Sequence, residues 1–237
     1  MNIIYNIAIG LGSLIIGYLI GSFPTAIVIG RVFYKQDPRH YGSKNAGGTN
    51  AGRLWGKKAG LTVMIVDIAK AVLSIWTVFM LINFTGLINV VNLWRQGMTY
   101  YYLASLGSAV GHCWPIYANF RGGKAVSALA GMVVATSWFL SLFGLVFFAI
   151  LKSKKFVSLS SIIAASTVAF AAFIMFIIDI FVPGFFNFGM WGGGSLFIVG
   201  WDYFVVILSI TIILIFRHRE NIERLTNNEE NKIHWIK

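Results

Sequence analysis

Long apolar segments alternate with short polar segments along the chain. The apolar segments cover residues 1–29, 59–87, 98–111, 125–151, 158–182 and 195–216. A helix needs about 20 mostly apolar residues to cross a bilayer, and most of these segments reach that length. The pattern therefore predicts an all-α polytopic membrane protein. We expect 1–29 to be a retained span, because it has no Lys or Arg at its start and no small-residue cleavage site.

The basic residues predict which side of the membrane each polar segment faces. All 19 Lys and Arg except Lys70 and Arg95 fall within residues 31–58, 121–124, 152–155 or 217–237. Short loops rich in Lys and Arg face the cytoplasm. We therefore expect all four groups on that side, with the N-terminus outside and the C-terminus cytoplasmic.

This orientation conflicts with a single crossing by the segment 125–151, because basic residues lie at both of its ends and one crossing would place them on opposite sides. Either it folds back near 135–138 as two short helices, or it crosses once and violates the charge rule. We favour the hairpin, although arms of about 13 residues are too short to cross ~30 Å at 1.5 Å per residue. The result is about seven transmembrane helices, two of them short, in a single domain over 1–237, with an external loop over 183–194.

Composition excludes several classes of protein. The chain is 57% hydrophobic and 11% charged, whereas soluble domains carry about 25% charged residues. A soluble enzyme, a disordered chain and a disulfide scaffold are therefore excluded, and the single Cys113 allows no intrachain disulfide. The net charge of +11 would indicate nucleic acid in a soluble protein, but here it predicts membrane orientation and no nucleic-acid partner.

The polar segment 42–58 carries the first group of candidate site residues. Its glycines allow close approach of the backbone to a ligand, and Ser43, Asn45, Thr49 and Asn50 supply hydrogen-bond donors. Arg53 can bind a phosphate through two parallel hydrogen bonds. The alternative is a flexible polar loop without a ligand. The segment is not a Walker A loop, because Gly-x-x-x-x-Gly-Lys-Ser/Thr is absent.

A second candidate is the segment 111–124, which ends in Gly122, Gly123 and Lys124 just before a predicted helix. Two glycines and a lysine at a helix N-terminus favour an anion nest, in which free backbone N–H groups and the positive helix end bind a phosphate. We interpret His112 in this segment as a packed histidine rather than a catalytic base.

Two further segments add polar residues on the same predicted face. Ser158 and Ser161 open the segment 158–182, where serine acts either as a helix cap or as a donor to a phosphate oxygen. His218 and Asn221 follow the last apolar segment. The alternative for that stretch is a solvated tail, which explains its arginines but not this combination of residues.

Asp67 and Lys70 lie three residues apart within the segment 59–87. Charged residues inside a membrane pair with one another, so we expect them to pair together or with Arg53, as structural support near the cytoplasmic end. No cluster of His and carboxylates predicts a metal site. Together, the four polar segments predict an anion site suited to a phosphate ester.

The motifs, taken in order, resemble one known family. They read Gly-Ser-x-Asn-x-Gly-x-Thr-Asn-x-x-Arg, Gly-Lys-Lys, Asp-x-x-Lys, Gly-His-x-x-Pro-x-x-x-x-Phe-Arg-Gly-Gly-Lys, Ser-Leu-x-Ser and His-Arg-Glu-Asn, over about 21–224. This set is similar to that of the bacterial membrane acyl-phosphate:glycerol-3-phosphate acyltransferases (PlsY). The resemblance implies a seven-helix enzyme of the bacterial cell membrane with a cytoplasmic-facing site. It further implies transfer of a fatty acyl group from acyl phosphate to the 1-hydroxyl of sn-glycerol 3-phosphate, the first acylation step of phospholipid synthesis.

The resemblance also assigns roles to residues of this chain. The matches in its motifs imply catalytic roles for Ser43, Arg53, Lys124, His218 and Asn221. Gly122 and Gly123 match the family's phosphate-binding loop, Ser158 or Ser161 matches a family serine, and Glu220 matches a structural glutamate. The chain departs from the family at Lys44 and Gly48, which usually are Gly and Ala, and at Ala71 and Ala125, which often are Gly.

The expected reaction needs no cofactor. Acyl phosphate is a mixed anhydride with an activated carbonyl, so positioning and charge stabilisation suffice. The general base stays open between a substrate phosphate oxygen and His218. Expected partners are acyl phosphate, glycerol 3-phosphate and the lipid bilayer, with an acyl-phosphate synthase as a candidate. A small-anion transporter is the alternative, although no internal repeat is evident, and a scaffold would not explain the phosphate-type loops.

Overall fold

Helices make up most of the part of the chain that the structure describes. The computed structural model covers residues 2–87, 93–94, 98–186 and 200–233, and no strand occurs among them. The elements are α1 (Asn2–Gly21), α2 (Thr25–Ile29), a π-helical turn (Gly30–Tyr34), 3-10 turns (Pro38–His40 and Ile116–Ala118), α3 (Gly48–Trp55), α4 (Lys57–Phe84), α6 (Met98–Cys113), α7 (Val126–Thr136), α8 (Trp138–Leu142), α9 (Gly144–Lys154), α10 (Val157–Phe181), α11 (Trp201–Arg217) and α12 (Arg219–Thr226).

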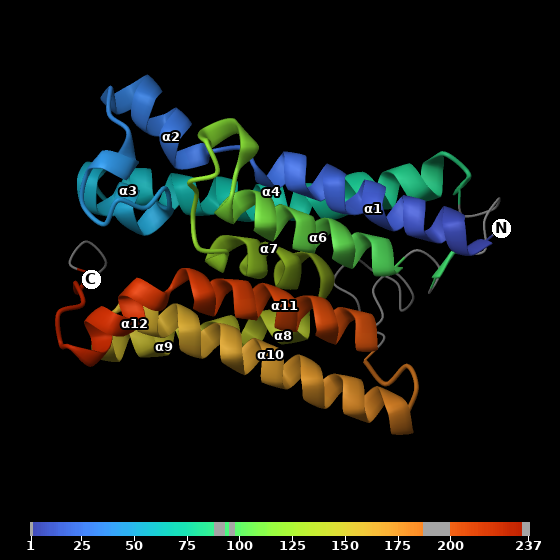
Figure 1. Ribbon diagram of the computed structural model, residues 1–237. Coiled ribbons are helices and arrows are strands. Elements are labelled where there is room, and N and C mark those ends of the chain that lie inside the picture. Colours follow the sequence, from blue (N-terminus) through green and yellow to red (C-terminus); the bar gives the residue numbers. More distant parts are fainter. Residues whose placement is uncertain (1, 88–92, 95–97, 187–199, 234–237) are drawn as a thin grey trace.

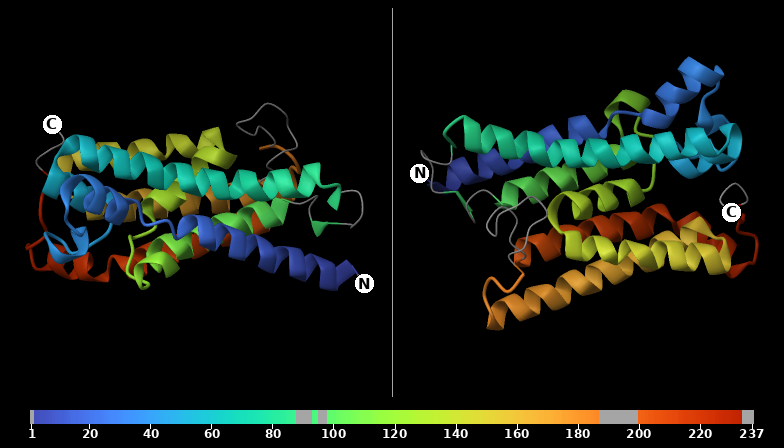
Figure 2. Two further views of the ribbon diagram at one scale, coloured as in Figure 1. Left: turned by 90° about the horizontal axis from the view of Figure 1, so that it is seen from above. Right: turned by 180° about the vertical axis from the view of Figure 1, so that it is seen from behind.

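The helices form two layers. Helices α1, α4 and α6 lie together in one layer, α9 to α12 lie in the other, and α7 lies between them (Figures 1 and 2). The start of α1 and helix α12 lie at opposite ends of the bundle. Helix α3, the α6–α7 loop, the end of α9 and α12 gather at one end, so the four polar segments meet there.

Helices α1 and α6 approach each other through glycine. A Cβ atom on Gly17 would lie 1.9 Å from the carbonyl oxygen of Ala104, and one on Gly107 would lie 2.2 Å from that of Leu14. Small residues allow such close contact between membrane helices, where van der Waals packing drives association. This packing builds a rigid support behind the site.

Within the described residues, three apolar stretches are long enough to cross a membrane, namely Ile3–Tyr34, Lys57–Phe84 and Val157–Phe181. A fourth arises if Trp201–Arg217 and Arg219–Thr226 count as one span with a bend of 56°. The expected number of seven spans and the expected orientation of the termini therefore stay predictions. The expected external loop 183–194 lies mostly outside the described residues.

The first predicted span is broken near its C-terminal end. Helix α1 ends at Gly21, and a new helix begins at Thr25 after Pro24, whose ring removes a backbone donor and so interrupts the helix. The helical stretch then continues to Tyr34, beyond the expected end at residue 29. The break frees the carbonyl of Phe23, which accepts a hydrogen bond from Lys70 Nζ at 2.9 Å.

The expected hairpin within 125–151 is present. Helix α7 ends at Thr136, Ser137 has an extended backbone, and its hydroxyl caps α8 by accepting from the N–H of Leu140 at 3.2 Å. Beyond α8 the chain runs back as α9 (Figure 2). Thr136 Oγ1 lies 2.8 Å from the hydroxyl of Tyr203 on α11, which fixes the far end of α7. The reversal returns both ends of this segment to the polar end of the bundle.

Candidate active site

A cavity of about 530 Å³ lies between the two layers and is polar at one end. All four polar segments contribute to its wall. The predicted site residues that line it are Ser43, Asn45, Thr49, Asn50, Arg53, Lys124, Ser158, Ser161, His218 and Asn221. The structure therefore brings together residues that lie far apart in sequence. Arg53, for example, is hydrogen-bonded to Asn231, which lies 178 positions further along the chain.

Asn50 organises the first loop. Its Nδ2 donates to the carbonyl oxygens of Pro38, Tyr41 and Asn45 at 2.9, 3.1 and 3.0 Å. Its Oδ1 accepts from the backbone N–H of Ser43 at 2.9 Å. These bonds engage both polar atoms, so Asn50 fixes the position of Ser43. Its expected role in substrate binding stays a prediction.

Arg53 reaches the cavity from the last turn of α3. This helix lies close against α4, since a Cβ atom on Gly48 would be 2.8 Å from the carbonyl oxygen of Gly60. One guanidinium nitrogen, Nη2, donates to the carbonyl of Asn231 at 3.1 Å. The Ser43 hydroxyl has no hydrogen-bond partner in the described part of the chain. Arg53 and Ser43 thus both present donors to the cavity.

Lys124 lies two residues before α7 and is directed at α12. Its Nζ donates to Oδ1 of Asn221. Burial is the main cause that lowers the pKa of Lys124 to about 8, and the positive charge of Arg224 lowers it further, against the opposing effect of Glu230. The ammonium group is therefore a half-buried cation whose proton is held less tightly than in solution.

Glu230 is a site residue that the sequence analysis missed. Its Oε1 accepts from Asn221 Nδ2 at 2.7 Å and from Ser158 Oγ at 2.9 Å, and its Oε2 accepts from Arg224 Nε at 2.9 Å. Burial alone would raise the pKa of Glu230, but the bonds from Asn221, Arg224 and Ser158 outweigh it and lower the pKa. The sequence offered one indication of this role, namely that Glu230 lies in the polar tail, nine residues after Asn221.

The two candidate serines on α10 differ in their partners. Ser158 Oγ donates to Glu230, whereas Ser161 Oγ donates to the carbonyl of Val157 at 2.8 Å within its own helix. Neither hydroxyl caps the helix, because α10 already begins at Val157. Ser158 therefore belongs to the polar network, and Ser161 lines the cavity with its hydroxyl already engaged.

His218 lies between α11 and α12 and is 3% exposed. Its Nδ1 lies 2.8 Å from the carbonyl oxygen of Leu214. A carbonyl can only accept, so Nδ1 carries the hydrogen and Nε2 is the acceptor in the neutral ring. The ring thus retains one nitrogen that can take a proton at the cavity wall.

Gly122 and Gly123 do not form the expected nest of free N–H groups. The N–H of Gly123 donates to the carbonyl of His112 at 2.9 Å, and that of Gly122 donates to Cys113 at 3.2 Å. Arg217 donates to the carbonyl oxygens of Gly123 and Gly122 at 3.1 and 3.4 Å. The two glycines lie beside a smaller cavity, and their contribution is to hold the loop that carries Lys124.

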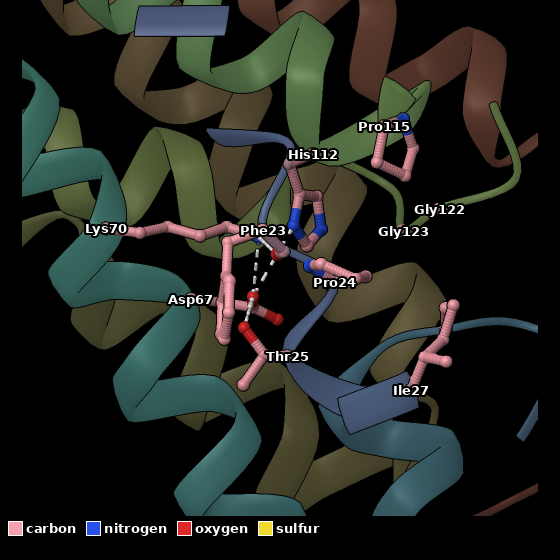
Figure 3. A pocket seen from close by; sticks show the side chains of 11 residues that line it. Phe23, Pro24, Thr25, Ile27, Asp67, Lys70, His112, Pro115, Gly122 and Gly123 are labelled. Atoms are coloured by element: carbon pink, nitrogen blue, oxygen red, sulfur yellow. Dashed lines mark hydrogen bonds and ion pairs between the residues drawn. The ribbon is translucent and has the colours of Figure 1, made fainter. Parts of the chain in front are cut away.

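Asp67 and Lys70 pair with each other, as expected, and not with Arg53. Lys70 Nζ lies 2.8 Å from Asp67 Oδ1, which also accepts from Thr25 Oγ1 at 2.8 Å. His112 Nδ1 lies 3.7 Å from the same oxygen (Figure 3). The cluster borders a cavity of about 10 Å³ and connects the broken first span to α4 and α6.

The structure also describes three other residues that the sequence analysis named: Glu220, Lys44 and Ala125. Glu220 is exposed and makes no hydrogen bond or ion pair in the described part of the chain, so the structural role expected for it stays a prediction. Lys44 and Ala125, two of the departures from the family pattern, have φ of 55° and 61°. Only glycine enters that left-handed region freely, which explains why glycine suits both positions.

Beyond its polar end the cavity is apolar. It continues between Ile68 on α4, Val133 on α7 and Val168 on α10. Ile65 and Phe148, which also line it, are each 64% exposed on the outer surface. The cavity therefore reaches the surface between α4 and α9. Among the described residues, no group of three or more His, Cys, Asp and Glu is placed to hold a metal ion.

Proteins of one family match this chain over nearly its whole length. A family model described as "Glycerol-3-phosphate acyltransferase" matches residues 11–228. A glycerol-3-phosphate acyltransferase of Listeria monocytogenes serovar 1/2a (strain ATCC BAA-679 / EGD-e) is 38% identical over 223 residues, which cover 94% of this chain and 96% of that protein. One of Staphylococcus aureus (strain Newman) is 36% identical over 225 residues, which cover 94% and 97%.

Solved structures agree with this match. The crystal structure of PlsY (YgiH), an integral membrane glycerol 3-phosphate acyltransferase, superposes in its glycerol 3-phosphate form with a TM-score of 0.72 and 28% identity, covering 95% of this chain and 96% of that one. Its lysophosphatidic acid form gives a TM-score of 0.70 at 28% identity, covering 96% of each chain. With its helical fold and polar cavity, this chain belongs to the glycerol-3-phosphate acyltransferase family and is a membrane acyltransferase.

Proposed function

We propose that this enzyme transfers a fatty acyl group from acyl phosphate to the 1-hydroxyl of sn-glycerol 3-phosphate. The products are lysophosphatidic acid and inorganic phosphate. Glycerol 3-phosphate and lysophosphatidic acid are the ligands of the related PlsY structures. The choice of acyl phosphate as the donor therefore rests on the cavity of this chain.

One observation carries the proposal: a single cavity has half-buried cations at one end and an apolar extension at the other. Arg53 and Lys124 supply positive charge for phosphate groups, and the apolar extension between α4 and α10 suits a fatty chain. A donor with a phosphate directly on its acyl carbonyl matches this change from polar to apolar lining.

In the proposed reaction the glycerol hydroxyl attacks the acyl carbon directly. The new C–O bond to glycerol forms as the C–O bond to phosphate breaks, the hydroxyl proton passes to a base, and phosphate leaves. Lys124 and Arg53 stabilise the negative charge on the phosphates, and Asn221 orients the hydroxyl. Preorganised charges of this kind lower the barrier without a covalent intermediate.

Two groups compete for the role of base. One is a substrate phosphate oxygen, with a second pKa near about 6, and the other is Nε2 of His218, the ring nitrogen that Leu214 leaves unoccupied. His218→Ala separates them. If the variant keeps a near-normal kcat and only KM rises, a phosphate oxygen is the base; loss of kcat assigns the role to His218.

We further propose that the enzyme resides in the bacterial cell membrane with its polar cavity facing the cytoplasm, the N-terminus outside and the C-terminus inside. The basic segments support this orientation. The short hairpin α7–α9 supports a total of seven membrane-embedded helices. An acyl-phosphate synthase, the enzyme class that makes the donor, is the partner that this arrangement suggests.

The test uses purified protein with palmitoyl phosphate and glycerol 3-phosphate. Release of inorganic phosphate that requires both substrates supports the proposal. Acyl-CoA and acylated acyl carrier protein are each tested in place of palmitoyl phosphate. Acyl transfer from either of them overturns the choice of acyl phosphate as the donor. Uptake of glycerol 3-phosphate into liposomes without turnover would instead indicate the transporter alternative.

A further inference from the structure

The loop that carries Lys124 is held on two sides. The end of α6 receives its N–H groups, since Gly122 and Gly123 donate to the carbonyls of Cys113 and His112. Arg217 on α11 binds its carbonyl oxygens. The backbone before Lys124 therefore has little freedom, and its position depends on where the end of α6 lies.

The imidazole ring of His112 lies directly against this loop. A Cβ atom on Gly123 would be 2.0, 2.6 and 2.9 Å from Nε2, Cε1 and Cδ2 of the ring, and these are its three nearest neighbours. On the opposite edge, Nδ1 faces Asp67 at 3.7 Å (Figure 3). One ring nitrogen thus lies against Gly123 and the other faces Asp67, while the ring also borders the main cavity. Its contacts on both sides suit a role in supporting the loop.

The partner on the far side of the ring is firmly held. Asp67 is 2% exposed and is fixed by Thr25 and by Lys70, which in turn binds the carbonyl of Phe23. A buried carboxylate fixed in this way is a stationary contact for the ring. The His112 ring is therefore clamped between α4 and the loop.

We propose that His112 is a positioning residue that sets the location of the Lys124 ammonium group through its contact with Gly123. The chain of contacts runs from Asp67 to the His112 ring, to the Gly123 backbone and to Lys124, whose Nζ meets Asn221. This inference rests on the proposed function only in taking Lys124 as a phosphate-binding cation. It does not depend on which acyl donor the enzyme uses.

A double-mutant cycle tests the inference with inorganic phosphate as the probe, so that the donor plays no part. We expect Lys124→Ala to weaken phosphate binding about 10- to 100-fold, the value of a charge-assisted hydrogen bond, and His112→Ala to weaken it about 10-fold. The double variant should bind within about threefold of Lys124→Ala alone, because neighbours that act through one group are not additive. Independent, additive losses overturn the inference. His40→Ala, an exposed histidine outside the site, is the control and should bind as wild type does.

A size exchange gives the second measurement. Gly123→Ala places its Cβ within the His112 ring, so it should abolish most phosphate binding. In the double variant Gly123→Ala with His112→Ala the obstructing ring is gone, and affinity should return to that of His112→Ala alone. Failure to recover, with thermal unfolding unchanged, overturns the inference. Failure of the proposed function looks different: phosphate binding and its coupling persist while palmitoyl phosphate is not used.

Discussion

Replacing Glu230 by glutamine tests whether the tail network orients the site. The carboxylate joins α10, α12 and the tail, because it accepts from Ser158, Asn221 and Arg224. Asn221 in turn accepts from Lys124. Glutamine keeps the shape of the side chain but removes its charge and turns an NH₂ group toward one of these donors. We expect Asn221 and Lys124 to lose their fixed orientation.

The magnitude follows from the bonds involved. Hydrogen bonds to a charged group contribute about 1.5–3 kcal/mol and neutral ones about 0.5–1.5 kcal/mol, so the bonds from Asn221 and Ser158 each weaken by about 1 kcal/mol. Arg224 is 33% exposed, and its ion pair with Glu230 adds at most about 1 kcal/mol. The total of about 2–3 kcal/mol corresponds to a fall in kcat/KM of about 30- to 150-fold.

The assay measures phosphate release from palmitoyl phosphate in the presence of glycerol 3-phosphate, in detergent or lipid cubic phase. Glu229→Gln is the matched control, since Glu229 is exposed and its side chain makes no bond in the described part of the chain. Thermal unfolding of both variants separates loss of fold from loss of orientation. A Glu230→Gln variant with kcat/KM within about threefold of wild type would refute the reasoning, because the bonds removed are too strong to vanish without effect.

Three further predictions follow from single groups. Lys124 has a pKa of about 8 and is protonated below that pH. We therefore expect kcat/KM to fall as pH rises through about 8, and Lys124→Arg to remove this fall. A wild-type profile that stays flat to about pH 10 would contradict the prediction. Ser158→Ala should lower kcat/KM about tenfold, whereas Ser161→Ala, which loses only a bond within its helix, should change it less than about threefold in the same assay. Gly17→Ala should lower the free energy of unfolding by about 1–3 kcal/mol, measured by thermal unfolding in detergent. Gly12→Ala is the control and should leave stability unchanged, because no atom lies within 4 Å of its new Cβ. Equal effects of the two variants would disprove the packing argument.

Several features of the fold were predictable from local patterns. The long apolar segments predicted α4 and α10 closely, and the charges at both ends of 125–151 predicted the reversal that the structure places at Ser137. Such features depend on residues near one another in sequence. The break at Pro24 was missed because the surrounding residues continue the apolar pattern on both sides.

The sequence by itself determined the membrane-embedded helical class, the polar segments that form the site, and the family that their motifs match. Only the tertiary structure decided what each polar atom does. It bonds Asn50 to its own loop, pairs the N–H of Gly123 with the carbonyl of His112, and brings Glu230 to Asn221 and Ser158. The physical reason is that apolar length and charge are local properties of the chain, whereas a hydrogen-bond partner is fixed by the packing of segments far apart in sequence, where each buried polar group must find one.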